Sequence, residues 1–153
     1  MNRLSATTSL EMKILDALRA LKLPVPCAGI MERADAGEQK EQDTTSAQVR
    51  VWNFAQANEA VAAFTASAEI RLVVEQSESA DGGTFFDAHE LIALWLEGVM
   101  LGDQCVALST DEVDVDGLQR TGGDKDFDAA INGWYASWNF TISGRVKPKT
   151  QEA

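Results

Sequence analysis

The 153-residue chain has few of the side chains on which reactive sites are usually built. Its two cysteines, Cys27 and Cys105, are too few for a disulfide framework and lack Cys-x-x-Cys spacing, so two reduced thiols are expected. His89 is the only histidine, which excludes a histidine-rich zinc site. No Gly-x-Ser-x-Gly or Cys-His signature accompanies it, so we expect a structural role for this side chain.

Basic residues and long apolar runs are also scarce. The chain has 13 Lys and Arg against 24 Asp and Glu, a formal charge of −11 and a pI near 4.4. This balance argues against sequence-specific nucleic-acid binding, which needs clustered basic residues. No run of 18 apolar residues exists, and the N-terminus lacks the apolar stretch of a signal peptide. The sequence therefore predicts a cytoplasmic product with no membrane partner.

Two helices are predicted from hydrophobic periodicity. Residues 9–22 place Leu10, Ile14, Leu18 and Leu21 on one face. Thr8 and Glu11 have the spacing of a capping box at the start of this helix. The second helix is expected to begin at a Thr84 cap, to run to about Met100 and to stop near Gly102.

Several strands are predicted from alternating apolar residues, and the last of them is the strongest. Residues 55–66 could be a short helix or a connecting loop, and Thr121–Asp124 is expected to be a turn. One α+β domain over residues 1–153 follows, with a mainly antiparallel sheet and two principal helices on one face. Polar composition predicts a mobile loop at 33–46 and a polar tail at 147–153. The expected strands are 26–32, 47–54, 68–76, one or two within 105–120, and Trp134–Arg145.

The acidic segment 111–128 is the one candidate metal site, and it fits the calcium-loop pattern poorly. An alignment that begins at Glu112 puts Gly123 where a bidentate Glu is needed. A second alignment from Asp124 puts Ala129 where glycine is needed. We interpret the segment as a solvated strand face, and we expect no metal site and no cofactor.

A subunit interface is suggested by the second helix, which is apolar over more than one face. Such a helix is either central in the fold or covered by a second chain. Residues 1–24 carry a net charge of +2 and the rest carries −13, so a head-to-tail contact would join opposite signs. The four tryptophans fit either a core or an interface. The predicted interface residues are Leu91, Leu94, Trp95, Arg19 and Lys22.

The layout over residues 9–146 resembles a known family. The segments that carry the resemblance are SLEMKILDALRAL, LPVPCAGIMER, AEIRLVVEQS, FFDAHELIALWLEGVML and GWYASWNFTISGRV. Their order is similar to that of the tail terminator proteins of long-tailed bacteriophages, the group that includes the lambda minor tail protein U. The chain departs from this group in its polar 33–46 and Ala-rich 55–66 segments.

The resemblance implies a structural protein of the virion rather than an enzyme. It implies an α+β subunit that forms a hexameric ring with copies of itself and caps the tail tube. The ring would contact the tail tube protein and present a joining surface to head-completion proteins at the neck end of the tail, after assembly in the host cytoplasm. Two alternatives stay open: a head–tail connector or tail-completion adaptor, and a metal-dependent hydrolase that uses the 111–128 carboxylates.

Overall fold

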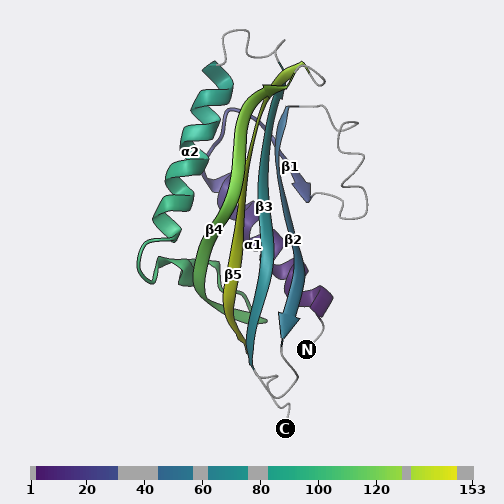
Figure 1. Ribbon diagram of the computed structural model, residues 1–153, viewed down its shortest axis with the longest axis vertical. Helices are drawn as coiled ribbons and strands as arrows, with labels where there is room; N and C mark the ends of the chain where they lie inside the picture. The colour runs from purple at the N-terminus through teal and green to yellow at the C-terminus, as the bar shows by residue number, and fades with distance from the viewer. Residues whose placement is uncertain (1–2, 31–44, 57–61, 76–82, 129–131, 148–153) are drawn as a thin grey trace.

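The fold is built on one sheet with the strand order β1-β2-β3-β5-β4 (Figure 1). The computed structural model describes residues 3–30, 45–56, 62–75, 83–128 and 132–147. All neighbouring strands are antiparallel except β1, which pairs parallel with the start of β2 at one edge. The strands are β1 (Cys27–Ile30), β2 (Ser46–Gln56), β3 (Ala63–Glu75), β4 (Val113–Asp128) and β5 (Gly133–Val146).

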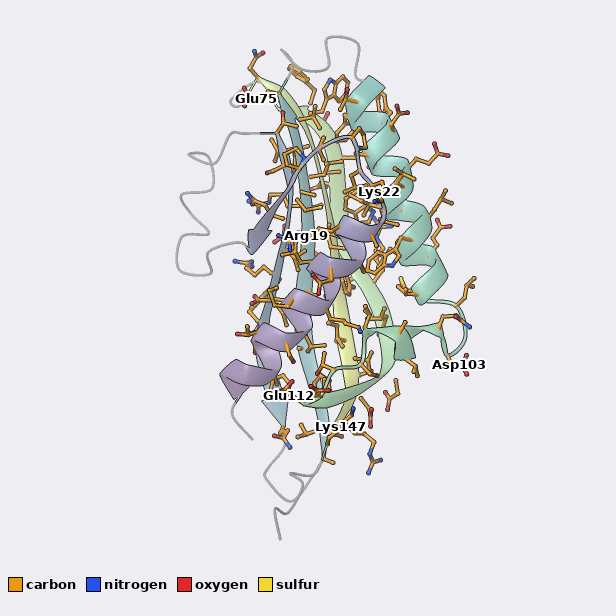
Figure 2. All side chains as sticks on the ribbon, turned by 180° about the vertical axis from the view of Figure 1, so that it is seen from behind. Arg19, Lys22, Glu75, Asp103, Glu112 and Lys147 are labelled. Atoms are coloured by element: carbon orange, nitrogen blue, oxygen red, sulfur yellow. The ribbon has the colours of Figure 1, made fainter. Side chains whose placement is uncertain are left out.

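Two long helices cover one face of this sheet, as Figure 2 shows from the helix side. They are α1 (Arg3–Ala20) and α2 (Gly83–Val99), and a short 3-10 helix, η3 (Gln104–Leu108), follows α2. Figure 1 shows the opposite face of the sheet, with α1 behind the strands. The predicted α+β fold, with a mainly antiparallel sheet and both helices on one side, is confirmed.

The hydrophobic core lies between the helices and the sheet. Strand β5 alternates as predicted and turns Trp138, Phe140 and Ile142 inward, all at most 1% exposed. Their partners on β3 in the same register are Ile70, Ala68 and Ala66, which are also buried. Val113 and Val115 on β4 also point inward, since both are fully buried. The same core takes in the buried faces of α1 and α2.

The start of α1 differs from the prediction, and the predicted capping box is wrong. The helix begins at Arg3, so Thr8 and Glu11 lie inside it. Glu11 is only 1% exposed, and its Oε2 accepts a hydrogen bond from the backbone N–H of Val51 at 2.9 Å. The carboxylate therefore holds α1 against β2 instead of capping a helix. Helix α2 begins at Gly83, one residue before the expected Thr84 cap.

Two segments that lack clear periodicity turn out to be strands. The expected turn at Thr121–Asp124 lies inside β4. The strand continues through these residues with a register shift between Arg120 and Gly122. Gly123 has a φ of 149°, which a side chain would disfavour. The Ala-rich segment 55–66 is expected from the sequence to be a helix or a loop. Its described ends are instead strand, since β2 runs to Gln56 and β3 begins at Ala63. Conversely, Cys105–Leu108 belongs to η3 and not to a strand.

Part of the predicted loop and tail falls outside the described residues. Residues 33–44 of the 33–46 loop and residues 148–153 of the tail are among them. Of the described residues in these two segments, Ser46 begins β2, and Lys147 forms an ion pair with Asp114, Nζ to Oδ1, at 3.6 Å.

Candidate functional site

The outer side of α2 is the most unusual surface of the described chain. Phe85, Ile92 and Leu96 turn toward the sheet and are buried. Leu94 lies about 200° around the helix from both Ile92 and Leu96, so it points straight away from the core. Its side chain is 58% exposed, and Leu91 next to it is 36% exposed. Helix α2 therefore has more apolar residues than the core covers, and in a single subunit the remaining apolar side chains are exposed to solvent.

The exposed apolar side chains continue beyond α2. Phe86 lies near the start of the helix, and Leu101 and Val106 lie in the turn after it and in η3. All three are at least 44% exposed. Single exposed apolar residues are normal on protein surfaces, but a succession along one element is typical of an interaction surface.

The five predicted interface residues all belong to the helix layer, but they differ in exposure. Leu91 and Leu94 are exposed, whereas Trp95 is half-buried and packs against the core. Arg19 and Lys22 lie at the C-terminal end of α1, on the same side of the sheet as α2 (Figure 2). Arg19 forms an exposed ion pair with Asp16 at 3.8 Å. Trp95 is therefore better placed to support α2 than to contact a partner.

The two helices differ in the charge of their exposed side chains. The outer side of α1 carries Lys13 and Arg19 as well as Asp16, and Lys22 follows the helix. Helix α2 has no Lys or Arg and carries the exposed acids Asp87, Glu90 and Glu97. One layer of the molecule thus has a basic part and an acidic part, each next to exposed apolar side chains.

His89 belongs to an aromatic cluster between α2 and strand β5 of the sheet. Its ring lies 4.8 Å from that of Trp138 and 5.7 Å from that of Phe85, measured between centroids. Burial lowers the pKa of His89, and the cations Lys125 and Arg120 of β4 lower it further. These contacts fit the structural role that we predicted for this residue, because the ring serves as a packing element.

The open face of the sheet carries an ion network that sequence reasoning missed. The Glu69 carboxylate forms ion pairs with two arginines: Oε1 lies 3.6 Å from Arg50, and Oε2 lies 3.4 Å from Arg71. The Arg50 guanidinium also lies 4.1 Å from the ring centroid of Trp52. The register places Arg50 directly opposite Glu69, and the alternation of β2 and β3 could have revealed the pair once their pairing was known. Trp52 is half-buried and stacks on this network through Arg50.

The acidic segment 111–128 does not gather its carboxylates into one site. Asp111, Asp114, Asp116, Asp124 and Asp126 are all exposed. Asp124 accepts a hydrogen bond from the Tyr135 hydroxyl at 3.3 Å, and Asp114 pairs with Lys147. Among the described residues, no three His, Cys, Asp or Glu side chains are grouped so that they could hold a metal ion.

Both cysteines are free thiols. Burial raises the pKa of Cys105 and of Cys27, and Arg19 offsets part of the effect at Cys27. A raised pKa reduces the thiolate fraction, so neither residue has the character of a reactive cysteine. None of the helices in the described segments has the length and apolar character needed to cross a bilayer.

Comparison with known proteins adds no family to this picture. No protein-family model matches the chain, and no curated protein sequence matches it significantly.

Proposed function

We propose that this chain is a structural protein of a bacteriophage virion, a tail terminator. Its copies would form a ring that caps the tail tube. The resemblance suggests six copies in this ring. The ring would also provide the surface to which head-completion proteins join. The chain would do this without catalysis and without a cofactor.

The observation that carries the proposal is the exposed apolar surface of α2. Burying a large apolar side chain contributes roughly 1.5–3 kcal/mol, so covering Leu91 and Leu94 with a second chain would favour binding at this surface. The acidic and basic parts of the helix layer add orientation to such a contact, because opposite charges favour one register. An assembly subunit needs a surface of this kind on each copy.

The same surface supports a head–tail connector, so the decisive test is made on the virion. The gene is deleted from the phage that carries it, and particles are imaged with and without the native gene supplied in trans. A terminator predicts tails of uncontrolled length that fail to join heads, with fixed length restored by the native gene. Tails of normal length that stay separate from heads would favour the connector. Normal tails joined to heads would rule out both assembly roles.

A further inference from the structure

The outer sides of α1 and α2 form two complementary surfaces. We call the first the basic face: Lys13, Arg19 and Lys22, with Asp16 and the exposed Met12 among them. We call the second the acidic face: Asp87, Glu90 and Glu97 around Leu91 and Leu94. The basic face has a net charge of +2 and the acidic face of −3, and each includes an exposed apolar side chain, Met12 beside Lys13 and Leu94 between Glu90 and Glu97.

The two faces do not neutralise one another within a subunit. The ion pair of Arg19 is with Asp16 of the same helix, and no ion pair joins α1 to α2 among the described residues. Both helices nevertheless lie on the same side of the sheet, so both faces are presented by one layer (Figure 2). A surface of each sign is therefore available to a partner.

We propose that the acidic face of one copy docks against the basic face of a second copy of this chain. The inference rests on the self-assembly in the proposed function and names the surfaces that meet. Leu94 would pack toward Met12, and Glu90 and Glu97 would lie near Lys13 and Arg19. Charged groups around an apolar centre are the usual arrangement of a specific protein interface.

A second copy fits this surface better than continuation of the sheet does. The alternative contact would use the edge strand β4, which pairs only with β5 in the described part of the chain. That strand has two register shifts and exposed charges on both of its faces, including Asp114, Asp116 and Lys125. Charges and bulges on an edge strand oppose pairing with another strand. The helix layer is therefore a better docking surface than the β4 edge.

The placement of both faces on one layer allows two modes of docking. Two copies related by a two-fold axis can satisfy both faces at once and stop at a dimer. If each copy uses its acidic face on one neighbour and its basic face on the other, the contact is head-to-tail and can close into a ring. The number of copies distinguishes these modes, and both use the same pair of faces.

The test uses two charge-reversed variants of the full chain. One carries Glu90→Lys and Glu97→Lys in the acidic face, and the other carries Lys13→Glu and Arg19→Glu in the basic face. We expect each variant alone to associate at least about tenfold more weakly than the native chain in sedimentation velocity, because like charges then meet. Mixed in equal amounts, the two variants should associate again, because the opposite signs are restored between them.

A matched control reverses two carboxylates elsewhere. Asp111→Lys with Asp116→Lys changes the net charge as much as the α2 variant does, but at the start of β4, and should associate like the native chain. Circular dichroism and thermal unfolding establish that each variant is folded. Should either reversed variant prove unfolded, Leu94→Ser replaces it, and a native-like association of Leu94→Ser counts against the docking.

Three results would overturn the inference. They are a native chain that stays monomeric up to about 1 mM, reversed variants that associate as the native chain does, and a mixture that fails to recover association. Recovery that stops at two copies would support the docking and count against the ring. The phage deletion tests the tail function independently, so failure of one proposal can be told from failure of the other.

Discussion

At the scale of the residue, the buried carboxylate of Glu11 should matter most for stability. Its Oε2 accepts the Val51 N–H in the core, on β2 just past the residues that pair with the described part of β1. Glu11→Ala removes the hydrogen bond to the Val51 N–H and leaves that buried donor without this acceptor. We expect a loss of about 2–3 kcal/mol in the free energy of unfolding, measured by urea denaturation at fixed protein concentration.

The control for Glu11 lies on the same helix. Asp16 is exposed and forms only the surface ion pair with Arg19, so Asp16→Ala should cost less than about 1 kcal/mol. Equal losses in the two variants would show that Glu11 contributes no more than an exposed acid does.

His89 should make stability depend on pH. Its pKa is lowered in the folded chain from the usual value of about 6.5, so the unfolded chain binds the proton more strongly. The contribution is fully present above pH 6.5 and is lost as the pH falls toward the lowered value. Urea unfolding at pH 7.5 and 5.5 should show a larger drop for the native chain than for His89→Phe. An identical drop in both would assign the pH dependence to other groups.

The two thiols should differ in their reaction with a disulfide reagent. Cys27 is half-buried and Cys105 is buried, so Cys27 should react first in the native protein and both should react after denaturation. Cys27→Ser identifies the faster thiol. Fewer than two reactive thiols in denatured protein without reductant would contradict the prediction of reduced cysteines.

At the scale of the element, sequence periodicity predicts β3, β5 and α2 well because each has one face in the core. The sequence alternation of β3, at Ile70, Leu72 and Val74, and that of β5 match the observed burial, because every second side chain packs in the core. It fails for β4, since an exposed edge strand needs few apolar residues and its glycines imitate a turn. The Glu11 contact could not be foreseen, because it depends on where α1 packs along β2.

Gly144 provides a test of how closely β4 and β5 approach. A Cβ atom there would overlap the carbonyl oxygen of Asp114, so Gly144→Ala must displace one strand from the other. We expect a loss of about 1–3 kcal/mol in the free energy of unfolding. Gly122→Ala, where a Cβ would meet nothing within 4 Å, is the matched control in β4 and should cost less. The reverse ranking of the two variants would contradict the observed register.

At the scale of the whole molecule, the candidate surface was predictable only in part. The excess apolar residues of α2 pointed to Leu91 and Leu94, and the structure places both in solvent. The sequence could not show that Trp95 turns inward or that the basic and acidic helices share one layer. Sheet pairing and helix placement decide these points, and both depend on residues far apart in the chain.

Self-association should respond to salt in a way that separates its charged and apolar components. Surface charges are screened over about 8 Å at physiological ionic strength and over about 3 Å at 1 M. If the basic and acidic faces meet, raising NaCl from 50 mM to 500 mM should weaken association several-fold, measured by light scattering. Leu94→Ser should weaken association at both salt concentrations. Association that strengthens steadily with salt would assign it to the apolar side chains alone.

The charged, bulged edge of β4 also bears on what happens when the protein is abundant. Sheets with bare, flat edges add further strands without limit and grow into fibrils. Here Asp114, Asp116 and Lys125 stand along the edge, and its register shifts break the straight line that an incoming strand would need. The β4 edge thus resists open-ended strand addition, whereas a contact between helices can close at a finite number of copies.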